Sequence, residues 1–159
     1  MLRTLPSLSI VLASLLFVAG CASGPTYADL SHRIPPIPEG QGRLYFYRPS
    51  SMAAGLRPAI RVNDRVVGDA TSKAWLFADF EPGSYTIKTS TLMEHSLTLE
   101  LGPGQERYVV LRSSVGLLAG HVYPRLASND EGRRALQGLA YVGPQSALLA
   151  PGDEEGEAP

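Results

Sequence analysis

Hydrophobic and polar residues alternate in short blocks from Gly42 to about residue 112, a spacing typical of β-strands with one buried face. Glycine, proline or Asn-Asp separates many of these blocks, and such residues favour turns. The blocks that predict strands are residues 44–48, 59–63, 65–68, 74–80, 85–89, 96–101 and 108–112. Because the strands are short and do not alternate with helical segments, the pattern indicates an antiparallel β-sandwich.

Two of the turns are specific enough to predict in detail. Asn63-Asp64 forms a tight turn between two alternating blocks and predicts a β-hairpin. The segment at residues 81–84 (EPGS) has proline at its second position and glycine at its third, which predicts a type II turn with Gly83 at positive φ.

The pattern is less regular in the C-terminal part of the chain. Residues 115–126 predict a strand interrupted by glycine and proline. Residues 128–136 predict a short helix with Ser128 or Asn129 as its N-cap and Gly138 near its end. The predicted fold class is therefore all-β, an antiparallel β-sandwich with one short C-terminal helix.

The N-terminus follows a different pattern. Arg3 precedes an apolar run over residues 8–18, shorter than the ~20 residues that a membrane-spanning helix needs. The run closes on four residues that match a bacterial lipobox: Val18, Ala19, Gly20 and Cys21. We therefore expect residues 1–20 to be a signal peptide and Cys21 to be lipidated. A signal peptide followed by a free cysteine, or a short membrane anchor, is the alternative.

Proline and glycine dominate the segment after this cysteine. They predict a tether over residues 21–41, in which neither helix nor sheet propagates. A polyproline ligand at residues 34–38 (IPPIP) is the alternative interpretation. At the other end, residues 144–159 include the acidic run 153–157 and predict a disordered tail. The globular domain is expected over residues 42–143.

Charge and cysteine content narrow the classes of protein to consider. The formal net charge is −1, which offers no electrostatic basis for nucleic-acid binding. Cys21 is the only cysteine, so its lipidation leaves no thiol for a disulfide or a cysteine-based metal site. Ala22 replaces the aspartate that commonly retains Gram-negative lipoproteins in the inner membrane. By resemblance to Gram-negative lipoproteins without that aspartate, we expect the protein to be attached through its acyl chains at the periplasmic face of the outer membrane.

Three segments together resemble the DUF2846 family of bacterial lipoprotein-like domains. The segments are residues 42–50 (GRLYFYRPS), 60–68 (IRVNDRVVG) and 77–86 (FADFEPGSYT). Asp64 stands where the family usually has glycine. The resemblance covers residues 42 to about 112 and implies a fold similar to PEGA and transthyretin-like sandwich modules. It implies no activity for any residue.

No residue pattern in the chain indicates catalysis. His32, His95 and His121 are accompanied by neither a Gly-x-Ser-x-Gly nor a His-Glu-x-x-His motif. Asp79 and Glu81 allow either a glycosidase-like carboxylate pair or, for Asp79, the cap of a turn. We expect no enzyme activity, no metal site and no cofactor, and we retain His121 as a candidate polar site.

The loop at residues 50–58 is the candidate binding surface, because loops on rigid sandwiches often carry recognition. Its candidate contact residues are Met52, Leu56 and Arg57; covering the open end of the sandwich is the alternative role for the two apolar side chains. The chain is thus expected to be a lipid-anchored, non-catalytic binding or scaffold module of the cell envelope. Its partner would be an envelope protein or peptidoglycan.

Two alternatives remain open: a cell-wall glycan-binding accessory and a small envelope hydrolase. Glycan binding is favoured if Trp75, Tyr45 or Tyr47 forms an exposed aromatic platform. A subunit of a larger envelope assembly is a further possibility, in which a partner strand extends residues 44–48 if they form an unpaired sheet edge.

Overall fold

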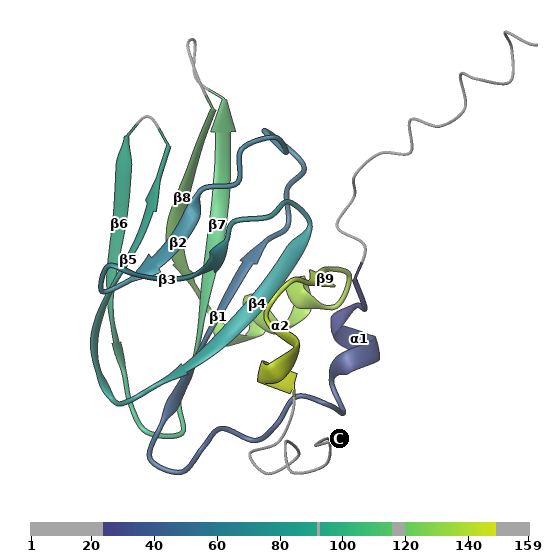
Figure 1. Ribbon diagram of the computed structural model, residues 1–159, viewed down its shortest axis with the longest axis vertical. Helices are drawn as coiled ribbons and strands as arrows, with labels where there is room; N and C mark the ends of the chain where they lie inside the picture. Colours follow the sequence, from purple (N-terminus) through teal and green to yellow (C-terminus); the bar gives the residue numbers. More distant parts are fainter. Residues whose placement is uncertain (1–23, 92, 116–119, 149–159) are drawn as a thin grey trace, which may run out of the picture.

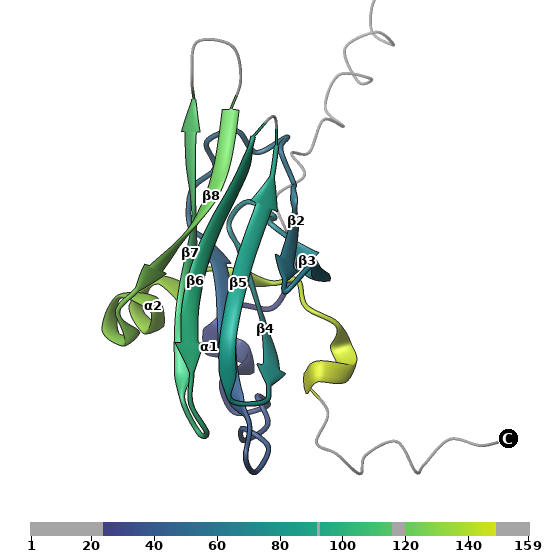
Figure 2. The same ribbon diagram turned by 90° about the vertical axis from the view of Figure 1, so that its left-hand side faces the viewer.

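Two β-sheets pack face to face in the computed structural model, which describes residues 24–91, 93–115 and 120–148 (Figures 1 and 2). The first sheet has the order β8-β7-β1-β4-β9 and the second the order β3-β2-β5-β6. The strands of the first sheet are β1 (Gly42–Arg48), β4 (Ala74–Phe80), β7 (Glu106–Val115), β8 (Gly120–Ala127) and β9 (Ala140–Tyr141). Those of the second are β2 (Ala59–Val62), β3 (Arg65–Asp69), β5 (Gly83–Ser90) and β6 (Glu94–Leu101). The all-β sandwich predicted from the sequence is confirmed.

Some of the predicted segments lie outside the described residues. They include the lipobox Val18, Ala19, Gly20 and Cys21, and the acidic run at residues 153–157. The expectations for these segments stay predictions. Within the described ranges, no helix has the length and apolar character needed to cross a membrane.

Strand β1 lies at the centre of the first sheet, and all seven of its residues are buried. It pairs antiparallel with β4 and parallel with β7, and β4 pairs parallel with β9. The sandwich is therefore mixed, whereas the sequence predicted an antiparallel one. The chain reaches β7 only after crossing to the second sheet and back, so β7 joins β1 in the same direction. Because β1 has two neighbours, the unpaired edge considered at residues 44–48 is also wrong.

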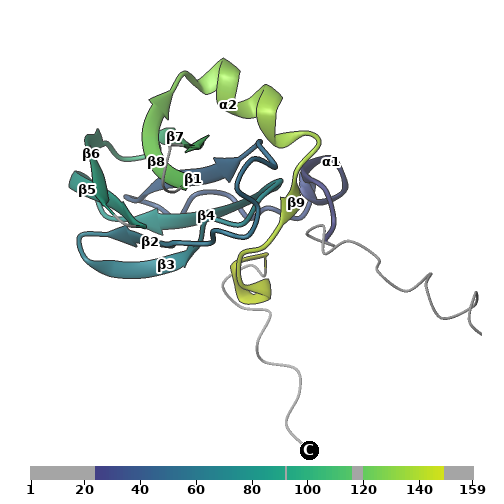
Figure 3. The same ribbon diagram turned by 90° about the horizontal axis from the view of Figure 1, so that it is seen from above.

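Alternate side chains of β1 enter two different cores. Leu44 and Phe46 lie in the core between the sheets, whereas Tyr45 and Tyr47 lie in a second core on the outer face of the first sheet. Two helices cover this outer face, α1 (Tyr27–Leu30) and α2 (Asn129–Leu136) (Figure 3). The first sheet is thus apolar on both faces.

The C-terminal helix α2 matches its prediction at the start. The Ser128 hydroxyl accepts a hydrogen bond from the Glu131 amide at 3.2 Å, as expected of an N-cap. Its C-cap is Gln137 rather than Gly138. The chain then adds β9 to the first sheet and ends its described part in η2 (Gln145–Leu148), where Leu148 is buried. The folded domain therefore extends beyond residue 143, the predicted boundary.

The tether predicted for residues 21–41 is wrong from residue 24 onward. Thr26 and Asp29 form a capping box that starts α1, a signal that the density of prolines obscured in the sequence. Leu30 is buried, and the ring of Tyr27 meets that of Trp75 edge to face with centroids 5.2 Å apart. Further along, the Arg43 guanidinium donates to the Pro35 carbonyl at 2.8 Å. This segment is therefore part of the domain.

The two predicted turns differ in outcome. Asn63 and Asp64 adopt left-handed φ values of 47° and 66°, as the tight hairpin between β2 and β3 requires. Gly83 does not: the positive-φ glycines in the described ranges are Gly40 and Gly104. Gly83 instead opens β5 opposite Leu101, so the type II turn is wrong. Strand pairing up to Gly83 replaces the local turn preference.

Candidate functional site

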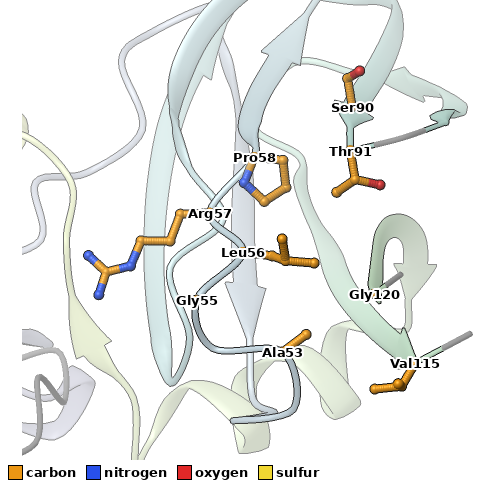
Figure 4. Close-up of a pocket in the computed structure, with 9 residues that line it drawn as sticks. All are labelled: Ala53, Gly55, Leu56, Arg57, Pro58, Ser90, Thr91, Val115 and Gly120. Carbon is orange, nitrogen blue, oxygen red and sulfur yellow. The ribbon is translucent and has the colours of Figure 1, made fainter. Parts of the chain in front are cut away.

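An open pocket of about 760 Å³ lies at one end of the sandwich, between the loop that precedes β2 and the ends of β5, β7 and β8 (Figure 4). We call this end the loop end and define it by residues 49–58, Thr91, Met93, Val115 and Gly120. The residues that line the pocket are Ala53, Gly55, Leu56, Arg57, Pro58, Ser90, Thr91, Val115 and Gly120. Most of the lining is apolar, with hydroxyl groups from the end of β5. Its size falls in the range of small-molecule pockets.

The loop between β1 and β2 forms one wall of the pocket and is held by a buried arginine. Arg48 is 0% exposed and closes β1, directly before the loop. Its two terminal nitrogens donate to the carbonyls of Met52 at 2.7 Å, Ala53 at 2.8 Å and Leu56 at 2.6 Å. A fourth carbonyl, that of Ala70, accepts at 2.8 Å. A single side chain thus determines the path of the loop backbone.

The electrostatic environment of Arg48 is unusual. Among the described residues, no carboxylate forms an ion pair with it; its remaining partner is the Ser113 hydroxyl, to which Nε donates at 2.9 Å. Burial lowers the pKa of the Arg48 guanidinium, although an arginine remains charged. Carbonyl dipoles take the place of a counter-ion, so the loop conformation and the buried charge stabilise one another.

The three loop residues predicted for binding take different positions. Leu56 lies in the wall of the pocket and is directed towards Gly120, whereas the Arg57 side chain points the other way (Figure 4). Gly120 packs closely against Leu56: a Cβ at residue 120 would lie 2.8 Å from Cδ1 of Leu56, so a larger residue would require that side chain to shift. Met52 is exposed and does not line the pocket. Of the three, Leu56 alone has its side chain in the cavity wall.

The candidate polar residue His121 lies next to the pocket and meets a second histidine. The rings of His121 on β8 and His95 on β6 meet edge to face with centroids 5.8 Å apart. Nδ1 of His121, Nε2 of His95 and Oγ1 of Thr91 are buried without hydrogen-bond partners. No group of three or more metal-ligating side chains gathers in the ranges that the structure describes. His32 lies apart, exposed after α1.

The carboxylates considered as a glycosidase-like pair are engaged elsewhere. Asp79 binds Arg43 through both oxygens, at 2.6 and 2.7 Å. Burial acts against the charged Arg43 guanidinium, but the interactions with Asp79 and Tyr45 together outweigh it and raise the pKa of this arginine. Glu81 accepts a hydrogen bond from the Gln41 side chain at 3.3 Å. Asp79 therefore neither caps a turn nor faces Glu81 across a cleft; it neutralises a buried arginine.

The aromatic platform considered for glycan binding is absent from the surface. Trp75 is 1% exposed and its indole donates to the Leu139 carbonyl at 3.1 Å. Tyr45 and Tyr47 are buried in the same outer core, and burial raises the pKa of each phenol to about 12. The ring of Tyr85 packs against that of Phe80, with centroids 5.1 Å apart. These rings stabilise the domain rather than present a flat binding surface.

Sequence reasoning missed Arg48 and the far wall of the pocket. Arg48 ends an aromatic strand and precedes proline, where an arginine normally reaches solvent, so nothing local indicated a buried role. Ser90 and Thr91 come from the end of β5 and the turn after it, and Val115 comes from the end of β7; the tertiary arrangement alone brings them to the loop. A glycine before the candidate histidine, Gly120, was the one signal of close packing.

Comparison with known proteins gives one family and one relative. The family described as "Protein of unknown function (DUF2846)" matches residues 38–122. An uncharacterized protein from Haemophilus influenzae (strain ATCC 51907 / DSM 11121 / KW20 / Rd) is 20% identical over 129 residues, covering 78% of this chain and 77% of the relative. The matched region spans the sandwich through the start of β8 and includes Arg48 and the loop that it holds.

Proposed function

We propose that this chain, which belongs to the DUF2846 family, is a lipid-anchored protein of the bacterial cell envelope that acts as a non-catalytic binding module. Acyl chains on Cys21 would hold it at the periplasmic face of the outer membrane. The single observation that carries the binding role is the open, largely apolar pocket at the loop end, whose wall is determined by Arg48. The ligand is then an apolar group of a partner in the envelope.

The site geometry favours binding over catalysis. A hydrolytic site needs a nucleophile, a base and a group that orients the base. In the described part of the chain, the buried ring nitrogens of His95 and His121 have no hydrogen-bond partner. Peptidoglycan is a less suitable ligand than an apolar group, because Trp75, Tyr45 and Tyr47 lie in the core.

The lipid anchor is tested by metabolic labelling. Cells expressing the chain or its Cys21→Ser variant receive an alkyne fatty acid, and their membranes are fractionated. We expect label on the wild-type chain in the outer-membrane fraction and none on Cys21→Ser. A soluble, unlabelled wild-type protein would contradict the proposed lipid anchor.

The binding role is tested by cross-linking in the same cells. Leu56→Asp places a charge in the pocket wall and should reduce cross-linked species at the loop end. Leu126→Asp is the matched control, an exposed leucine near the other end of β8. Equal cross-linking of the two variants would contradict a ligand in the pocket.

A further inference from the structure

The chain between the proposed anchor and the folded domain is short. Residues 24–41 pack on the domain, so two residues, 22 and 23, separate Cys21 from it. The Tyr141 amide donates to the Pro25 carbonyl at 2.9 Å, which holds this segment from its first residues. From Cys21 to Gly24 a fully extended chain spans at most about 11 Å. A lipidated Cys21 would therefore keep the point of entry into the domain close to the bilayer surface.

This point of entry lies beside the loop end rather than at the opposite end of the sandwich. Thr26 pairs with Ala140, Ala140 pairs with Ala74, and Ala74 pairs with Arg48. Arg48 is the last residue of β1 before the loop at the loop end. The other end of β1, at Gly42, is about 20 Å away along the strand. A short anchor thus brings the loop end, and not its opposite, near the lipid.

The loop end also carries exposed apolar side chains. Met52 is 50% exposed, Met93 57% and Val115 68%; they lie in the loop between β1 and β2, in the turn between β5 and β6, and at the end of β7. Together they make up half of the large hydrophobic residues that are exposed in the described ranges. In Figure 2, the end of β7, the end of β5 and the start of β2 lie at the same end of the two sheets. A group of exposed apolar side chains at one end of a domain is typical of protein or membrane contact sites.

The flank next to the point of entry has a different character. Helix α1 and the turn after it expose Asp29, His32 and Arg33. Burying these polar and charged groups in an apolar medium is unfavourable, so this flank is suited to water. Beside the point of entry, Val142 is the exposed large apolar side chain, at 38% exposure; the larger apolar group near the anchor is that of the loop end.

We propose that the loop end rests on the bilayer that holds Cys21, with Met52, Met93 and Val115 inserted at the lipid interface and a lipid acyl chain in the pocket. This inference rests on the proposed lipid anchor and names the partner of the same site. Three inserted side chains bind a bilayer weakly on their own. The anchor makes their insertion an intramolecular event with a high effective concentration, which stabilises the contact.

The experiment uses the full-length chain in cell membranes that contain a diazirine phospholipid. After irradiation, mass spectrometry maps the cross-linked peptides. We expect cross-links at the peptides that carry Met52, Met93 and Val115. The variant Met52→Asp/Met93→Asp/Val115→Asp should lower these cross-links by about tenfold, because charged groups do not enter the interface. The matched control Leu126→Asp should leave them unchanged.

The outcomes separate the anchor from the orientation. Acyl label on Cys21 with phospholipid cross-links on α1 or at the opposite end overturns the orientation and leaves the anchor intact. Cross-links from the loop end to a protein instead of lipid overturn it as well. Wild-type chain without acyl label overturns the anchor, and the orientation with it. If the triple variant is degraded, Met93→Asp alone, at the tip of the β5–β6 turn, provides the same comparison.

Discussion

At the scale of single residues, Arg48 shows how a buried charge can organise a surface. Its five hydrogen bonds end on four backbone carbonyls and one hydroxyl, none of which carries a charge. A buried cation is tolerated when every donor is satisfied, because desolvation is then compensated by oriented dipoles. The loop therefore depends on the arginine, and the arginine depends on the loop.

Replacing Arg48 tests this dependence. Arg48→Met keeps much of the side-chain volume but leaves the carbonyls of Met52, Ala53, Leu56 and Ala70 without donors. We expect the free energy of unfolding to fall by about 3 kcal/mol, measured by urea denaturation. Arg57→Met, an exposed change in the same loop, is the control and should alter stability by less than about 0.5 kcal/mol. Equal stability of the two variants would show that the bonds to Arg48 do not hold the loop.

At the scale of elements, α2 packs closely against the first sheet because Gly132, which faces Tyr108, has no side chain. A Cβ at Gly132 would lie 2.2 Å from the ring of Tyr108, a distance that no packing allows. Glycine is a poor helix former, so its presence inside a helix has a packing cause here. The helix approaches the sheet because residue 132 has no side chain.

This contact reverses the usual effect of a glycine-to-alanine change. Gly132→Ala improves helix propensity by about 1 kcal/mol, but the new methyl group must displace either Tyr108 or the helix. We expect a net loss of about 2 kcal/mol, seen as a lower thermal midpoint. Gly138→Ala is the matched control, because no atom lies within 4 Å of the added Cβ. A stabilised Gly132→Ala variant would refute the close approach.

Helix α1 depends on a capping box as well as on burial. Thr26→Ala removes the hydroxyl that accepts from the Asp29 amide, and the expected loss is about 1 kcal/mol. We expect faster amide hydrogen exchange at Leu30 and Ser31, with exchange in β1 unchanged. Ser31→Ala, at the other end of the turn, serves as the control. Equal exchange in the two variants would show that packing against Trp75 alone holds α1.

At the scale of the whole molecule, local patterns predict the strands but not what surrounds them. The alternation around Ile87 and Leu99 follows from one buried face, which each strand carries in its own sequence. The fold of residues 24–41 depends on Trp75 and Ala140, which are distant in the chain. The parallel pairing of β1 with β7 and of β4 with β9 also depends on residues that are distant in the chain. The same is true of the pocket wall opposite the loop. Contacts of this kind leave no periodic trace.

The domain boundary gives a test at this scale. A chain that ends at residue 143 lacks Leu148, which is buried in the outer core, and the carbonyl of Pro144, which accepts from the Tyr141 hydroxyl at 3.0 Å. We expect its free energy of unfolding to be about 2 kcal/mol lower than that of a chain that ends at residue 148. Urea denaturation of both chains makes the comparison. Identical urea midpoints for the two chains would show that the folded domain ends at residue 143.

The central position of β1 also has a consequence for biosynthesis. β1 is the first strand to be made, yet its parallel neighbour β7 pairs with it through Glu106–Val110. Until the ribosome has added those residues, one backbone edge of an aromatic strand has no partner. An uncovered edge of this kind favours pairing between chains and aggregation. The nascent protein therefore needs the segment from Glu106 onward, or a chaperone in its place, to protect this edge of β1.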